Sequence, residues 1–330
     1  MMRSVLAIFL ICFLTNTNSS AQERSTFFSK GFFTPSDTLD HVRFNYALGG
    51  SAAIYTGVSI GLYNTWYRKF PQEGFHLFND NGEWNNMDKY GHVYSAYFQS
   101  LLCYKGAKWV GINEDKSILT GVICGGLFQT TIEIMDAFSS EWGFSIGDVT
   151  ANVVGLGAFA VQQKYWGEQR IFLKLSSYPQ PYPDQFVVGS SGTSVSLGQR
   201  AQNLFGTSFA ERFLKDYNAQ TYWVSVNIHS FLPEGNKWPV WLNIAAGIGA
   251  DNLYGGFDNT WSSAGETFSV DPNAYPRVTQ FYLGTDIDLT KIKTNNQLLK
   301  GVFSIFNIFK MPSPAIELNT QGEIRFHLFR

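Results

Sequence analysis

An acid, a base and a histidine lie close together in "DKYGH" at 88–92, directly before an aromatic and apolar run. Asp88 and His92 are four residues apart, a spacing that places both side chains on one face of a helix. A histidine beside a carboxylate can transfer protons as a general acid or base, and the same pair can ligate a cation. Residues 88–92 are therefore the first candidate for chemistry in this chain.

Two further segments interrupt apolar runs with side chains of the same kinds. "QTTIEIMD" at 129–136 carries carboxyl groups on one helix face, and "SIGDVTAN" at 145–152 carries a carboxyl and an amide four residues apart. Ionisable groups in apolar segments must find partners or shift their pKa. We therefore expect the three faces to meet inside a helical bundle as one polar cluster, made of Asp88, Lys89, His92, Glu133, Asp136, Asp148 and Asn152.

Three interpretations of this cluster remain open. It can be a hydrogen-bonded network that fixes the register of the helices, a divalent-cation site with nitrogen and oxygen donors, or a cleft in which His92 transfers protons. The candidate catalytic residues are His92, Glu133, Asp136 and Asp148, and the candidates for ligand binding are Asp88, Lys89, Asn152 and His76. The sequence shows no nucleophile elbow and no phosphate-binding loop, and it identifies neither a metal nor a cofactor.

His76 comes from "FHLFNDNGEW" at 75–84, which is richer in functional side chains than a connecting loop requires. His76 and Asp80 could both reach the cluster from this loop. Asn and Asp side chains also cap their own turns, and residues 79–82 have the composition of such a turn. We therefore expect Asp80 to serve the turn and leave the role of His76 open.

Four apolar helices are expected to position these side chains. The corresponding segments are 44–67, 88–110, 113–138 and 145–163. Asn113 or Asp115 is a suitable N-cap for the third helix. Ser145 is a suitable N-cap for the fourth, with Asp148 in the first turn, where an acid complements the helix dipole.

Glycines recur at four-residue spacing in two of these segments, at Gly57 and Gly61 and at Gly121 and Gly125. This spacing lets helix backbones approach closely and is favoured where helices pack in lipid. A tightly packed bundle outside a membrane is the alternative. The pattern slightly favours membrane association.

The second half of the chain alternates apolar and polar residues with a period of two. In "TYWVSVNIHSF", Tyr222, Val224, Val226 and Ile228 fall on one face, and similar alternation occurs at 277–289 and 323–330. Such alternation predicts an antiparallel sheet with one covered face. The expected fold class is α+β, with a segment at 22–42, a helical domain at 43–166 and a β-rich domain at 167–330.

The first residues predict export. "MMRSVLAIFLICFL" has one positive charge and a short apolar run, and small residues follow, so we expect a signal peptide at 1–21, with an uncleaved anchor as the alternative. Cys12 lies inside the apolar run, which does not support a lipoprotein modification. Cys103 and Cys124 are expected to be free thiols. A net charge of -2 gives no electrostatic case for nucleic acid.

Three stretches together resemble the YfiM-like family of predicted periplasmic or outer-membrane-associated proteins. They are "WYRKFPQEGFHLFNDNGEWNNMDKYGH", "IEIMDAFSSEWGFSIGDVTANVVG" and "LKDYNAQTYWVSVNIHSFLP". The helical part is also similar to the VanZ family of small membrane proteins, whose pattern is matched by Asp88, Lys89, His92, Glu133, Asp148, Asn152 and Gly155. Short YfiM-like members are lipoproteins anchored through an N-terminal cysteine, which this chain lacks after its predicted signal peptide.

The resemblance implies an exported envelope protein and supplies no reaction. We therefore expect a structural or interaction role in the periplasm or at the outer membrane, with a polar cluster available to a small ligand or ion and a membrane or envelope component as partner. The alternative is a hydrolase or transferase that acts on lipid or cell-wall material through His92 and the neighbouring carboxylates. An outer-membrane barrel is a third hypothesis.

Overall fold

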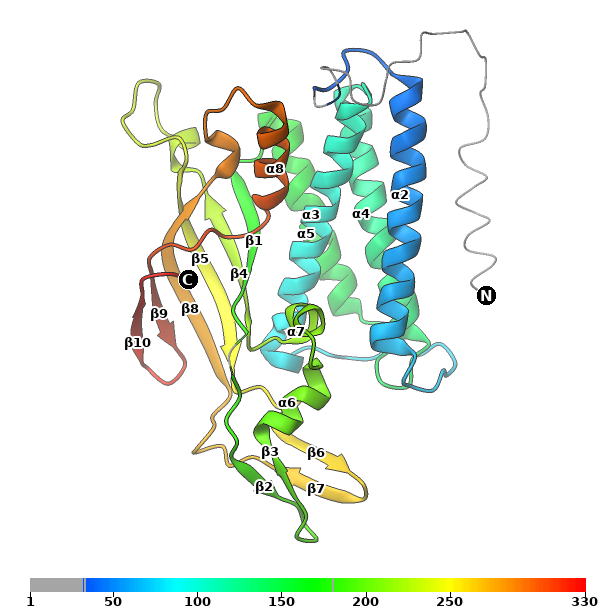
Figure 1. Ribbon diagram of the computed structural model, residues 1–330, viewed down its shortest axis with the longest axis vertical. Helices are drawn as coiled ribbons and strands as arrows, with labels where there is room; N and C mark the ends of the chain where they lie inside the picture. Colours follow the sequence, from blue (N-terminus) through cyan, green and yellow to red (C-terminus); the bar gives the residue numbers. More distant parts are fainter. Residues whose placement is uncertain (1–31, 33, 180) are drawn as a thin grey trace. The chain divides into compact units, whose positions relative to one another are not determined.

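A computed structural model describes residues 32, 34–179 and 181–330 (Figure 1). The predicted signal peptide lies outside these residues. Helices come first along the chain and an antiparallel sheet follows, so the α+β fold class is confirmed. The division into two domains stays a prediction.

Four long helices form the first half, at the places that the apolar segments predict. They are α2 (His41–Leu62), α3 (Met87–Trp109), α4 (Glu114–Ala137) and α5 (Ile146–Trp166). The predicted caps of α4 and α5 are confirmed. The Asn113 side chain accepts a hydrogen bond from the backbone N–H of Lys116, and the Ser145 hydroxyl accepts one from Asp148, each at 3.1 Å. The predicted first helix ends earlier than expected, because a π-helical turn follows α2 at Tyr63–Tyr67.

Small residues bring α3, α4 and α5 close together (Figure 1). A Cβ atom on Gly155 of α5 would lie 2.2 Å from the carbonyl oxygen of Val93, and one on Gly125 of α4 would lie 2.4 Å from the Ser100 hydroxyl. Gly57 and Gly61 of α2 differ, because no described atom lies within 4 Å of a Cβ built there. Among the described residues, therefore, the α4 pair packs helix against helix and the α2 pair does not.

The helical half leaves much apolar surface exposed. No residue of α2 in the described chain is buried. Among the described residues, α4 alone is long and apolar enough to cross a membrane, and 28% of its most apolar window is buried. A core helix passes the same test of length and composition, so this is weak evidence for a membrane span.

The second half is built on a six-stranded antiparallel sheet with strand order β1-β4-β5-β8-β9-β10. The strands are β1 (Ile171–Ser177), β4 (Gln220–Val226), β5 (Leu242–Asp251), β8 (Val278–Ile287), β9 (Ala315–Asn319) and β10 (Ile324–His327). Two hairpins, β2 (Phe186–Val188) with β3 (Ser194–Ser196) and β6 (Thr260–Ser263) with β7 (Glu266–Ser269), complete the strands. Shorter helices connect them, namely α6 (Leu197–Phe205), α7 (Phe209–Lys215) and α8 (Gln297–Phe306).

The sequence predicted an antiparallel sheet with one covered face, and in much of this sheet the more covered face is the polar one. In β8 and β9, Leu283 is 60% exposed and Ile316 53%, whereas Asp286 and Glu317 are buried. One register row crosses the whole sheet on the apolar face, through Leu173, Val224, Ala246, Leu283, Ile316 and Phe326. Ile228 does not join this face, because it begins a 3-10 turn after β4 ends.

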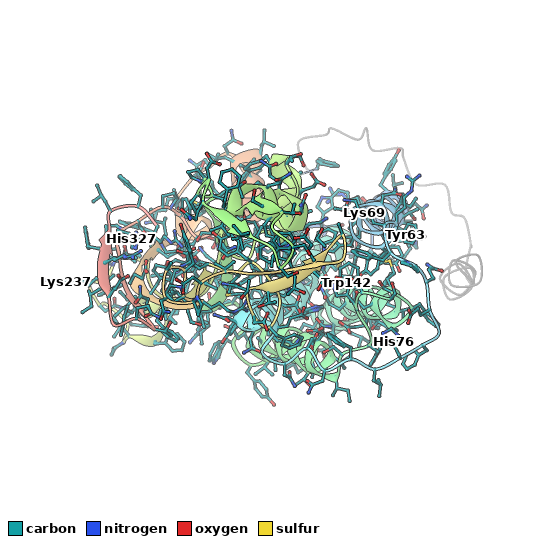
Figure 2. All side chains as sticks on the ribbon, turned by 90° about the horizontal axis from the view of Figure 1, so that it is seen from below. Tyr63, Lys69, His76, Trp142, Lys237 and His327 are labelled. Carbon is teal, nitrogen blue, oxygen red and sulfur yellow. The ribbon has the colours of Figure 1, made fainter. Side chains whose placement is uncertain are left out.

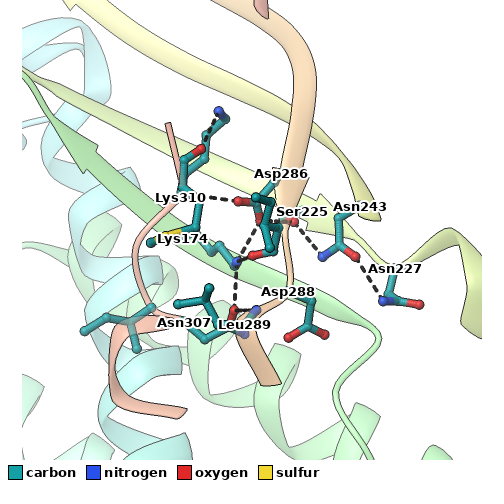
Figure 3. Close-up of polar contacts among 12 residues, drawn as sticks. Lys174, Ser225, Asn227, Asn243, Asp286, Asp288, Leu289, Asn307 and Lys310 are labelled. Atoms are coloured by element: carbon teal, nitrogen blue, oxygen red, sulfur yellow. Dashed lines mark hydrogen bonds and ion pairs between the residues drawn. The ribbon is translucent and has the colours of Figure 1, made fainter. Parts of the chain in front are cut away.

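Polar side chains on the other face form hydrogen bonds and an ion pair with one another (Figure 3). Lys174 lies 2.7 Å from Asp286, and both side chains are fully buried. Ser225 donates to Asp286 at 2.6 Å and accepts from Asn243 at 2.9 Å. Because a buried polar group costs little once it is paired, this network lets the sheet turn its polar face inward. The apolar rows therefore face outward wherever α3 does not cover them.

Candidate functional site

His92 stands where the three predicted helix faces meet. Its Nδ1 atom lies 3.1 Å from Oδ1 of Asn152 and 3.6 Å from Oε1 of Glu133. Its Nε2 atom lies 3.6 Å from Oδ1 of Asp148 and 3.8 Å from Oδ1 of Asp88. The structure thus brings residues of α3, α4 and α5 together around one imidazole ring. Their functional roles stay predictions.

Lys89 binds three carboxylates of the cluster. Its Nζ atom lies 2.6 Å from Asp148, 2.7 Å from Asp80 and 3.3 Å from Asp88. Asp80 also accepts a hydrogen bond from the Ser145 hydroxyl at 2.6 Å. Asp80, which we expected to serve a turn, therefore belongs to the cluster.

Asp136 extends the cluster along α4. It accepts a hydrogen bond from the Tyr67 hydroxyl at 2.7 Å, and Tyr67 belongs to the π-helical turn after α2. The sheet half contributes as well, because Tyr217, which follows α7, donates to Asp88 at 2.8 Å. The cluster therefore joins residues from across the chain.

His76 lies apart from these groups. Its Nε2 atom is 2.6 Å from the carbonyl oxygen of Trp142, and its Nδ1 atom is 3.2 Å from that of Gly74. Figure 2 shows His76 and Trp142 over the helical half, with Tyr63 and Lys69. Through these contacts with backbone carbonyl oxygens, His76 holds its own loop against residue 142.

A cavity of about 220 Å³ opens beside the cluster. Among the described residues, five carboxyl side chains and one histidine line it, namely Asp80, Glu83, Asp88, Asp136, Asp148 and His92. Aromatic side chains form much of the remaining wall, namely Trp66, Tyr67, Phe78, Trp84, Trp142, Tyr217 and Tyr222. We call this space the acidic cavity. Its acids outnumber its bases, so it favours a positively charged occupant.

The pKa values around the histidine reflect this excess. Burial alone would lower the pKa of His92, but the carboxylates of Asp88, Asp148, Glu133 and Asp136 outweigh burial and raise it to about 9. Burial and the neighbouring Asp88 raise the pKa of Asp148 to about 8. Burial also acts to raise the pKa of Asp80, but hydrogen bonds from Asp148, Lys89 and Ser145 outweigh it and lower that pKa. At neutral pH the imidazole is therefore a cation and the Asp80–Asp148 pair shares one proton.

Two carboxyl groups deeper in the site are also hard to ionise. Burial raises the pKa of Asp136 to about 8, although the Tyr67 hydrogen bond opposes this. Burial raises the pKa of Glu133, and its Oε2 atom has no hydrogen-bond partner within the described chain. Gln129, which lines the cavity, leaves its Oε1 atom without a partner there as well. Of these groups, Asp136 and Gln129 line the acidic cavity, whereas Glu133 does not.

Asp88, His92 and Asp148 could in principle hold a metal ion, because one ligand atom from each lies within 4.8 Å of the others. The Lys89 ammonium already lies 2.6 Å from Asp148 and 3.3 Å from Asp88. A divalent ion would have to displace this ammonium and meet a protonated imidazole. The donor set therefore suits a metal poorly while Lys89 stays in place.

Comparison with known proteins finds one family model that matches part of the helical half. Residues 72–164 match the family of predicted periplasmic lipoproteins DUF2279. This segment holds every predicted site residue, from His76 to Asn152, whereas Tyr67 and Tyr217 fall outside it. No curated protein and no solved structure matches the chain.

The DUF2279 description supports an exported, periplasmic protein, so the predicted localisation is confirmed. It names no biochemical activity. The resemblance to a periplasmic family of unknown function is thereby supported at this coarser level. The match covers less than a third of the chain, and the sheet half lies almost wholly outside it.

Proposed function

We propose that this protein is a periplasmic envelope protein of the long YfiM-like type, with a VanZ-like helical half, and that its acidic cavity binds a small cationic ligand. An ammonium group is the chemistry that its walls favour. Aromatic faces attract cations, and carboxylates neutralise them. The tryptophans Trp66, Trp84 and Trp142 line the same cavity as Asp136.

The observation that carries this proposal is the excess of acid in the cavity. Five carboxyl groups line it with one histidine, and Lys89 pairs with Asp80, Asp88 and Asp148. Asp136 is bonded instead to a neutral donor, the Tyr67 hydroxyl. The pKa of Asp136 is raised to about 8 because its carboxyl group is buried without a paired cation. A bound ammonium would ionise Asp136 and release its proton.

Isothermal titration calorimetry of the full chain with tetramethylammonium tests this proposal. We expect saturable binding at pH 7 that releases about one proton, measured from the heats in buffers of different ionisation enthalpy. Asp136→Asn should weaken binding by about tenfold or more and abolish proton release. Asp115→Asn is the matched control, because Asp115 also lies on α4 but is exposed and pairs with Lys164.

Mg²⁺ and Mn²⁺ titrations distinguish an ammonium from a metal. Binding of these ions with no heat from tetramethylammonium would replace the ammonium proposal by a metal site. No binding of either kind would leave the polar cluster a structural network and end the proposal. Equal affinity in wild type and Asp136→Asn would exclude Asp136 from ligand binding.

One observation favours the alternative, a hydrolase or transferase that acts on envelope lipid or cell-wall material. Asn152 fixes Nδ1 of His92, while Nε2 lies beyond hydrogen-bond distance of both Asp88 and Asp148. An imidazole held in this way can transfer a proton at Nε2. Turnover of acyl or phosphoryl ester substrates that His92→Gln abolishes and Asp115→Asn retains would support an enzyme.

We propose a membrane as the partner. The outward apolar rows of the sheet support this, because exposed apolar patches of this extent mark interaction surfaces. Ile324 and Phe326 of β10 are 74% and 69% exposed.

A further inference from the structure

A second cavity borders the acidic cavity. It is a groove of about 300 Å³ between α3 and the sheet. Its walls include Tyr90, Val93 and Tyr94 of α3 and Val224, Ala246 and Ile248 of the sheet. We call it the apolar groove, because the groups that line it are mainly hydrocarbon and aromatic. It begins where α3 stops covering the apolar face of the sheet.

The start of α3 separates the two cavities. Gly91, His92 and Ser95 line the acidic cavity, whereas the neighbouring positions 90, 93 and 94 line the apolar groove. Tyr222 of β4 lines both. A Cβ atom on Gly91 would lie 3.0 Å from the Tyr222 hydroxyl, so this side chain packs against α3 between the two cavities. A molecule that spans both cavities has to displace the Tyr222 side chain, and it would then meet acids at one end and apolar groups at the other.

We propose that the ligand is an amphiphile, with its ammonium head in the acidic cavity and a hydrocarbon chain in the apolar groove. This inference rests on the proposed function and names the ligand class. Charge complementarity places the head, because the carboxylates line only the acidic cavity.

Calorimetry with two probes, tetramethylammonium and octyltrimethylammonium below its micelle concentration, tests this inference. We expect the eight-carbon chain to tighten binding by about tenfold or more, because burying each methylene is favourable. Ala246→Trp fills the groove without touching the acids. It should abolish this gain and leave the tetramethylammonium affinity unchanged.

Leu283→Trp is the matched control, because Leu283 is the register partner of Ala246 and does not line the groove. This variant should keep the gain. If the chain adds no affinity, or if Ala246→Trp retains the gain, the amphiphile proposal is wrong although tetramethylammonium binding still supports a cation site. If neither probe binds, the proposed function fails and the amphiphile proposal fails with it.

Discussion

Asp136 and His92 give the site an unusual dependence on pH. Both hold their protons more tightly than in an unfolded chain, since their pKa values rise from the ordinary 3.8 and 6.5 to about 8 and about 9. A group whose pKa is raised on folding stabilises the fold at low pH and loses this contribution as the pH rises. Asp136 loses its contribution between about pH 4 and 8, and His92 loses its own between about pH 6.5 and 9.

We therefore expect the free energy of unfolding to fall as the pH rises from about 5 to 9. The slope should approach 1.4 kcal/mol per pH unit for each proton released. Urea titrations at several pH values measure it. Asp136→Asn should flatten the slope, whereas Asp115→Asn should retain it. A stability that rises across this range would show that Asp136 is ionised in the folded protein.

Lys89 should matter more for stability than its neighbours on the surface. It pairs with Asp80 and Asp148 in a largely buried site. Removing one member of a buried pair typically costs about 3–5 kcal/mol. We expect Lys89→Met to lose about this much in urea unfolding. Lys164→Met, which breaks an exposed pair with Asp115, should cost far less. Equal losses in the two variants would contradict this assignment.

The residues that could be predicted are those with a helical spacing. The pairs Asp88 and His92, Gln129 and Glu133, and Asp148 and Asn152 each lie four residues apart within one helix. The sequence of each helix therefore shows its own part of the cluster. Tyr217 could not be predicted in this way, because only the packing of the sheet half brings it to Asp88. Asp80 lies in a loop, where a carboxylate that caps its own turn has the same sequence pattern.

At the level of elements, α5 offers two glycines with opposite surroundings. A Cβ on Gly155 would meet the carbonyl oxygen of Val93 at 2.2 Å, whereas one on Gly157 would meet no described atom within 4 Å. We expect Gly155→Ala to lower stability by about 1–3 kcal/mol through overpacking. Gly157→Ala should raise it by about 0.5–1 kcal/mol, because alanine favours the helix. Urea titration measures both. A stable Gly155→Ala would mean that α3 and α5 can separate at no cost.

Helix positions and caps were predictable because their signals are local. The sheet faces were not, since alternation shows which residues share a face but not which face is covered. Lys174 and Asp286 are far apart in the sequence, and their pairing makes the polar face the buried one. The sequence alone therefore left open which face of the sheet is buried.

At the level of the whole molecule, the outward rows predict binding to lipid vesicles. We expect the full chain to float with vesicles of phosphatidylethanolamine and phosphatidylglycerol. The double variant Ile324→Asp, Phe326→Asp should float several times less, because charge on an apolar patch opposes contact with lipid. Val188→Asp is the control, since Val188 is 66% exposed on the separate β2–β3 hairpin. Equal flotation of all three proteins would rule out this face.

Trp84, Asn85 and Asn86, which precede α3, are all in the left-handed region of backbone conformation. Contacts with the sheet half hold this turn. The backbone N–H of Trp84 donates to Gly256 at 2.7 Å, and Arg277 donates to Asn85 at 3.2 Å. Trp84 also lines the acidic cavity and packs on Tyr217. We therefore expect a ligand in the cavity to stabilise the sheet half as well as the helices. An ammonium bound among the helices should slow proteolysis of loops of the sheet half, which lie more than a hundred residues away in the sequence.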